Sequence, residues 1–109
     1  MLTLYNAGLS DNSIQILASG LEQSHGLIYL DVRQNNFENL GFQELAKSLT
    51  GQNQLLTLRI NAVLIEREEL KVLQNLFSHE NCQIQNLEME ELEINDSMSK
   101  DLIEAVSKL

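Results

Sequence analysis

The sequence repeats one apolar pattern four times, and this repetition constrains the fold more than any other feature of the chain. The clearest copy runs from Leu27 to Leu45 and reads LIYLDVRQNNFENLGFQEL. One column of the pattern holds a leucine in every copy: Leu2, Leu30, Leu58 and Leu87. The first two intervals along this column are equal, and the third is one position longer. Self-similarity at such a nearly constant period is the signature of a repeat architecture.

Each copy is predicted to form a short strand followed by a helix. Leu30 and Val32 are two residues apart and therefore share one face of a strand. Phe42, Leu45 and Leu49 are three and four apart, as on one face of a helix. Two further columns are apolar in every copy: Leu4, Val32, Ile60 and Met89, then Leu9, Phe37, Ile65 and Ile94.

A single copy would leave the apolar faces of its strand and helix half exposed, whereas stacked copies bury these faces against one another. We therefore predict one α/β solenoid domain. Parallel strands should line its concave side and helices its convex side, because helices are wider than the spacing between strands. The four repeats span approximately residues 1–26, 27–54, 55–83 and 84–109.

The repeat resembles the leucine-rich repeats of the ribonuclease-inhibitor type. The family pattern is LxxLxLxxNxL, followed by a helix, and its period equals the intervals of the leucine column described above. In the second copy its positions are held by Leu27, Leu30, Val32, Asn35 and Phe37, and Gly41 falls near the family glycine that precedes the helix. The resemblance covers nearly the whole chain. It implies the fold but no activity, because a fold of this kind serves many unrelated functions.

The turn after each strand departs from the family pattern. The position that the family fills with Asn or Cys holds Ala7, Asn35, Val63 and Leu92. An asparagine side chain there can satisfy backbone groups of the turn. Only Asn35 fits, so we expect apolar packing to hold the turns of the third and fourth copies.

Neither end of the sequence shows a separate polar capping unit. Solenoids usually need caps, because their terminal repeats otherwise expose core residues. We expect the chain to be part of a longer array or to have its ends covered by another protein. The alternative is that Met1 is a genuine start and that the first strand frays.

Composition excludes several classes of function. A net charge of −9 argues against nucleic acid as a partner, since phosphate binding needs a basic surface. A single cysteine allows no internal disulfide and fits a cytoplasmic protein, including one in a cytoskeletal or organellar assembly. No apolar run approaches the length of a membrane span.

Strand alternation also predicts which residues face outwards on the concave side, where a partner would bind. Tyr and Arg are the types most enriched at binding hot spots. We expect a protein-binding strip formed by Tyr5, Tyr29, Asp31, Arg33, Arg59, Asn61, Glu88 and Glu90. The alternative is a set of ordinary solvated strand residues that pair across strands. If the strip binds a partner, replacing Arg33 and Arg59 together by glutamate should weaken binding and leave thermal stability nearly unchanged.

The last copy is the most acidic. By copy the charge is −2, −1, −1 and −5, and the final strand and turn read NLEMEELEIND, which includes Glu91 and Glu93. Three interpretations remain open: a solvated end that aids solubility, a site for a basic protein segment, and a metal site. The spacing of known calcium loops is absent from this run.

Leu64 is an unusual residue for its place in the repeat. It aligns with Gly8, Asn36 and Glu93, so it is either an exposed apolar turn residue that contacts another chain or the mark of a local shift of the repeat.

Cys82 and His79 are three apart, but nothing suggests the third group and oxyanion site that a Cys-His nucleophile needs. We expect no catalytic residues, cofactor or metal.

The function that we expect is a non-enzymatic protein-interaction scaffold, as a subunit or fragment of a larger assembly. The alternative is a regulatory module, resembling the Ran-type GTPase-activating proteins or the sensor repeats of innate-immunity receptors, which share this repeat. Stimulation of GTP hydrolysis by a small GTPase would favour the alternative. Stable co-purification in a large complex without such stimulation would favour the scaffold.

Overall fold

A computed structural model describes residues 1–23, 26–36, 38–52, 54–61, 64–90 and 93–109. Over these residues strands and helices alternate along the chain. In order they are β1 (Leu2–Thr3), α1 (Asp11–Glu22), β2 (Tyr29–Asp31), α2 (Asn39–Leu49), β3 (Thr57–Asn61), β4 (Leu64–Ile65), α3 (Arg67–Ser78), β5 (Asn86–Glu90), β6 (Glu93–Ile94) and α4 (Asp96–Val106).

The strands form a parallel sheet in the order β1-β2-β3-β5. The leucine column of the sequence pairs directly across it, with Leu2 opposite Leu30, Leu30 opposite Leu58, and Leu58 opposite Leu87. The predicted parallel pairing and register are therefore confirmed. A second, two-stranded parallel sheet joins β4 to β6.

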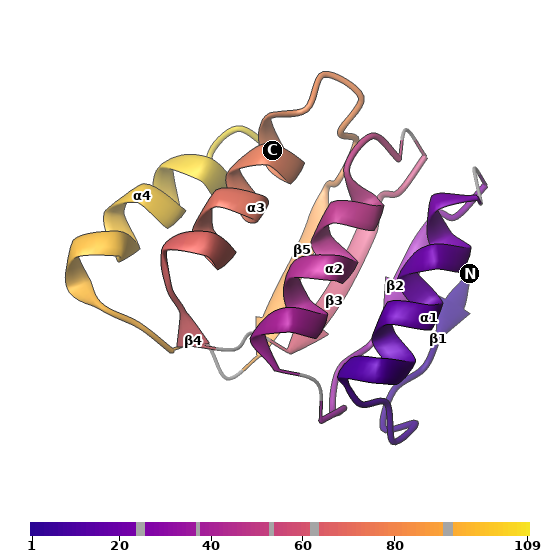
Figure 1. Ribbon diagram of the computed structural model, residues 1–109. Coiled ribbons are helices and arrows are strands. Elements are labelled where there is room, and N and C mark those ends of the chain that lie inside the picture. The colour runs from indigo at the N-terminus through magenta and orange to yellow at the C-terminus, as the bar shows by residue number, and fades with distance from the viewer. Residues whose placement is uncertain (24–25, 37, 53, 62–63, 91–92) are drawn as a thin grey trace.

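The helices lie in a row on one side of the sheet, with α1 and α4 at opposite ends of the row (Figure 1). The core lies between these two layers, as the alternating pattern predicts. Leu30, Leu58 and Phe42 are buried within it. Leu2 and Leu87 are only partly buried, because each belongs to an outer strand of the sheet. The chain is thus a mixed α/β protein with its helices on one face of a parallel sheet.

Leu64 is exposed, and it lies in the short strand β4 rather than in a turn. Leu64 pairs with Glu93, and Ile65 pairs with Ile94, so this strand pair keeps the same interval that separates Leu58 from Leu87. The register therefore gives no sign of the local shift that was one of the two interpretations of this residue.

Asn35 joins the turns of the first two copies. Its Oδ1 accepts from the backbone amides of Ala7 (3.0 Å) and Leu9 (2.9 Å). Its Nδ2 donates to the carbonyls of Leu4 (3.0 Å) and Val32 (2.9 Å). Asn35 is buried, so these bonds satisfy backbone groups that water reaches poorly. The role predicted for Asn35 is confirmed. Its equivalents Val63 and Leu92 lie outside the described residues, as does Phe37 of the apolar column.

Asn61 extends this arrangement into the third copy. Its Oδ1 accepts from the backbone amide of Gln34 (2.9 Å). Gln34 and its equivalent Asn6 have left-handed backbones, with φ of 60° and 52°. Residues other than glycine adopt this conformation at a cost, and asparagine does so more readily than most. Asn61 was expected to face a partner, but its side chain also holds the turn beside it.

Asp11 caps the helix of the following copy. Its Oδ1 accepts from the backbone amides of Glu38 (2.6 Å) and Gly41 (3.2 Å) at the N-terminus of α2. These amides belong to the first turn, where an α-helix has no internal acceptors. Gly41 was expected before the helix, but it is the third residue of α2. The glycine is therefore part of the helix start, where its amide meets the carboxylate of Asp11.

Replacing Asp11 by alanine is expected to lower the free energy of unfolding by about 1 kcal/mol, the usual loss when a helix cap is removed. Urea denaturation followed by circular dichroism measures this change. Asp101→Ala is the control, since Asp101 is an exposed acidic residue of α4 that lies outside this cap. Equal losses in the two variants would assign the effect to charge rather than to capping.

Two polar side chains also link neighbouring copies near the helix starts. Glu69 is buried, and its carboxylate accepts from Gln43 Nε2 of α2 (2.5 Å) and from the backbone amide of Glu66 (3.0 Å). Asn39 Nδ2 donates to the carbonyl of Leu64 (2.9 Å). Neighbouring copies are therefore held together both by the burial of their apolar faces and by these hydrogen bonds.

Candidate functional site

The sheet face opposite the helices carries the predicted binding residues, and we call it the open face. The parallel register arranges them in rows that cross the strands. One row contains Asp31, Arg59 and Glu88, and the next contains Asn61 and Glu90. The open face consists of Thr3, Tyr5, Tyr29, Asp31, Arg33, Thr57, Arg59, Asn61, Asn86, Glu88 and Glu90.

Arg33 is the centre of an ion-pair cluster on this face. Its guanidinium makes a two-pronged contact with Asp31, through Nε to Oδ1 and Nη2 to Oδ2, both at 2.9 Å. Nη1 reaches past β3 to β5, where it contacts Glu88 (2.7 Å) and Glu90 (3.2 Å). A planar guanidinium matches a carboxylate in this geometry better than an ammonium does. The cluster therefore joins strands of the second and fourth copies.

These contacts shift the pKa values of Asp31 and Arg33. Hydrogen bonds from Arg33 hold the pKa of Asp31 below its ordinary value of 3.8, although burial opposes this shift. The same bonds raise the pKa of Arg33 above its ordinary value. Asp31 is only 4% exposed. Asp31 and Arg33, both predicted for the binding strip, bind each other, and Arg33 covers the carboxylate, which favours the alternative of paired strand residues for these two.

Two tyrosines lie beside the arginines. The Arg33 guanidinium lies over the ring of Tyr5, 5.2 Å from its centroid, and that of Arg59 over Tyr29 at 5.7 Å. Contacts at these distances are attractive through the ring quadrupole. Tyr5 remains 52% exposed. Aromatic rings held in place by cations are thus presented at the surface of the open face.

Arg59 and Glu88 border a shallow hollow on the open face, between β3 and β5. Arg59 Nε lies 3.7 Å from Glu88 Oε2, and both side chains are close to half exposed. The hollow is lined by Thr57, Arg59, Gln85, Asn86, Leu87 and Glu88. Unlike Asp31, these two charged groups keep hydrogen-bonding capacity toward solvent.

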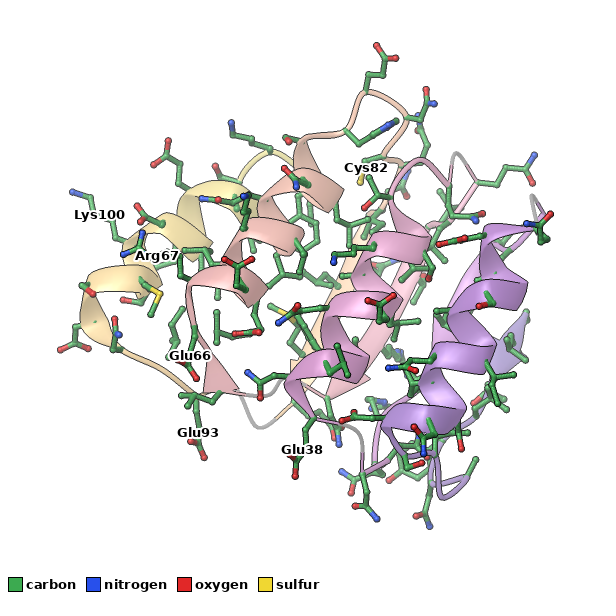
Figure 2. The ribbon with its side chains drawn as sticks, in the orientation of Figure 1. Glu38, Glu66, Arg67, Cys82, Glu93 and Lys100 are labelled. Carbon is green, nitrogen blue, oxygen red and sulfur yellow. The ribbon has the colours of Figure 1, made fainter. Side chains whose placement is uncertain are left out.

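The acidic residues of the last copy separate into two groups. Glu88 and Glu90 bind Arg33, as described above. Glu93 and Asp96 are exposed, and Figure 2 places Glu93 at the end of the molecule where Glu38 also lies, near the helix starts. Within the described ranges no group of three or more His, Cys, Asp or Glu residues could hold a metal ion. Glu91 lies outside the described residues.

Cys82 and His79 follow α3. Cys82 is partly buried and packs against the core. In Figure 2 it lies near the C-terminal ends of α2 and α3. His79 Nδ1 accepts from the backbone amide of Asn81 (3.1 Å). This bond organises the turn, so His79 has a structural contact that needs no catalytic role.

No protein-family model and no curated protein matches this chain. Among the helices of the described residues, none is long and apolar enough to cross a membrane.

Sequence reasoning found most of the open face but missed how its residues are used. The row position of Asn61 was predicted, whereas its bond to the turn of the previous copy was not. Asp11 was not singled out at all, and the bond from Gln43 to Glu69 between copies was not predicted. A signal for Asp11 exists in the sequence, because the same position of the repeat holds an aspartate again at Asp96.

Proposed function

We propose that this chain is a leucine-rich-repeat solenoid and works as a non-enzymatic protein-binding scaffold within a larger cytoplasmic assembly. The open face of the sheet would be the concave surface on which the partner lies. The strand register, which pairs the leucines of successive copies, supports the repeat. The residues gathered on the open face support binding.

The observation that carries the proposal is the pairing of Tyr5 with Arg33 and of Tyr29 with Arg59. A tyrosine offers a large contact area at low entropic cost, particularly when a neighbour already restricts its ring. Arg33 is fixed by three carboxylates, so its contribution is to position Tyr5. Tyr5, Tyr29 and Arg59 are therefore the anchors proposed for the partner, and Arg33 is a supporting residue.

The partner is a protein segment that lies across the strands. Such a segment would place apolar or aromatic side chains against the two tyrosines and a polar or charged group in the hollow between Arg59 and Glu88. The hollow offers one cation and one anion, so it suits side chains that both donate and accept hydrogen bonds.

A peptide library displayed on phage tests this proposal. Peptides are selected on the 109-residue chain, synthesised, and titrated by calorimetry against Tyr29→Ala and Arg59→Ala. Each substitution is expected to raise the Kd by about tenfold or more, as is usual for an interface anchor. Lys47→Ala is the matched control, because Lys47 is exposed on α2 on the helical side.

Selected peptides that bind both open-face variants as tightly as the original chain would contradict the proposal. Thermal melts of the variants accompany the titrations, since Tyr29 and Arg59 are partly exposed and their loss should change stability little. A large drop in stability together with unchanged binding would make these residues structural.

A further inference from the structure

Within the described residues, both ends of the row of copies carry an unpaired strand edge. β1 and β5 are the outer strands of the sheet. The amide of Asn86 donates to Leu56, just before β3 (3.0 Å), and successive residues of a parallel strand bond to opposite sides. The backbone groups of Leu87 and Met89 therefore point to the outer edge. Such an edge is a template for another strand.

The outer helices expose large apolar residues on the flanks that face away from the other helices. Ile16 of α1 is 76% exposed, whereas its equivalent Val72 in α3 is 7% exposed and lies between α2 and α3. Ile103 of α4 is 69% exposed; of its three equivalents, Ala18 and Ala46 are buried and Gln74 of α3 is exposed. Val72, Ala18 and Ala46 show that a neighbouring copy can cover these two positions inside the chain.

The two ends also complement each other at the helix starts. Asp96 stands at the repeat position of Asp11, the residue that caps the next helix, α2. Asp96 is exposed at the first residue of α4. At the other end, the N-cap of α1, Ser10, makes no side-chain capping bond. The amides equivalent to those that Asp11 caps belong to Ser10 and Ser13, and no acceptor for them is found in the described part of the chain.

We infer that a second copy of this chain stacks head to tail on the first. The α1 end of one copy packs against the α4 end of the other and continues the register of the repeat. The Met89 amide then donates to the Thr3 carbonyl of the second copy, as Leu4 donates to Asp31 and Val32 to Arg59 inside the chain.

The same stacking provides an acceptor for the free amides at the start of α1 and covers the apolar flanks of α1 and α4. The carboxylate of Asp96 accepts from the Ser10 and Ser13 amides of the second copy. Gly20 of α1 is the repeat equivalent of Leu76, which is buried in α3. Open space lies beside Gly20, so the Ile103 side chain of the neighbouring copy has room there. The interface thus reuses the contacts that join the copies within one chain. It lies on the outer edges and flanks, so it stands independently of the proposed binding on the open face.

This interface joins two different surfaces, so it does not close on itself as a two-fold dimer does. Repetition of such a contact gives a ring or an open filament. Each chain carries a net charge of −9, and like-charged chains repel one another. Added salt screens that repulsion, so stacking should strengthen with ionic strength. A basic protein docked on the acidic last copy would instead bind more weakly as salt is added.

Sedimentation equilibrium of the 109-residue chain, over a range of protein and salt concentrations, tests the inference. The average mass should rise above the monomer mass of 12.4 kDa with concentration, and more steeply at higher salt. Ile16→Glu and Ile103→Glu should each weaken association by about tenfold or more, because each buries a charge in place of an apolar side chain. Asp96→Ala should weaken it by up to about tenfold, with Asp101→Ala as the matched control.

Mixing the two isoleucine variants gives the decisive result. Each variant keeps one intact end, so an equimolar mixture should form a dimer that grows no further, while each variant alone remains monomeric. Circular dichroism checks that both exposed substitutions leave the chain folded. The inference is overturned if the original chain stays monomeric at its highest soluble concentration, if the mixture fails to form a dimer, or if added salt weakens the association.

Discussion

Replacing Asn35 by alanine is expected to lower the free energy of unfolding by about 3 kcal/mol, because the change leaves one buried and three partly buried backbone groups without the partner that they have in the folded chain. The lost acceptor serves the amides of Ala7 and Leu9, and the lost donors serve the carbonyls of Leu4 and Val32. These four groups belong to two different copies. The variant should therefore loosen the first copy as well as its own turn.

The midpoint of urea unfolding measures this loss, and hydrogen exchange locates it. Faster exchange of the Ala7 and Leu9 amides is expected in Asn35→Ala. Asn36→Ala is the matched control, because Asn36 is the exposed neighbour, and its loss should change stability by less than about 0.5 kcal/mol. A loss below about 1 kcal/mol for Asn35→Ala would mean that apolar packing holds these turns without the side chain.

The secondary structure could be predicted because it depends on local periods that recur in four copies. Leu30 and Val32 mark one strand face, and Phe42 and Leu45 mark one helix face. Any single copy would be ambiguous on this evidence. The recurrence of both periods at a nearly constant interval determined the parallel register, since only that pairing places equivalent leucines side by side.

The use of the open-face residues could not be predicted in the same way. Alternation states that Asp31, Arg33 and Glu88 share a face, but it gives no distance between side chains. Arg33 is long enough to reach past β3 to β5, and its guanidinium can donate to several carboxylates at once. Whether such a group faces solvent or a neighbour is decided by side-chain rotamers, which a spacing pattern does not contain.

The capping contact of Asp11 could not be predicted from the local sequence either. Its capping contact joins residues 27 and 30 positions apart, so it belongs to the interface between copies and not to the local helix start. The sequence rule for helix caps looks for the acceptor immediately before the helix. At α2 that position is Glu38, whose side chain makes no capping bond. The acceptor at α2 comes instead from the previous copy, whereas at α4 the local rule holds, because Asn95 accepts from the amide of Met98.

Replacing Asp31 by asparagine is expected to lower the free energy of unfolding by about 2 kcal/mol at neutral pH, because charge-assisted hydrogen bonds to Arg33 are lost. Arg33→Met should also destabilise the chain, since it removes the guanidinium that hydrogen-bonds the buried carboxylate of Asp31. These contacts lead us to expect that reversing the charge of Arg33 together with that of Arg59 also lowers stability, contrary to the expectation from the sequence. Glu93→Gln, at an exposed carboxylate of the same sign, is the control.

The pH dependence of this loss identifies its cause. The pKa of Asp31 is lower in the folded chain than its ordinary value of 3.8, so the folded state favours the ionised carboxylate. The resulting stabilisation is fully present above that ordinary value and is lost as the pH falls through the folded pKa. The difference in unfolding free energy between the original chain and Asp31→Asn should therefore be constant near neutral pH and shrink below 3.8.

Taking the difference between two chains matters here, because acidification also reduces the net charge of −9 and thereby relieves repulsion throughout the molecule. That change is nearly common to both chains and cancels, whereas the titration of Asp31 does not. The double variant Asp31→Asn with Arg33→Met should lose less stability than the sum of its parents, as expected for residues in direct contact. Additive losses, or a difference independent of acid pH, would mean that the Asp31–Arg33 contact contributes no stability of its own.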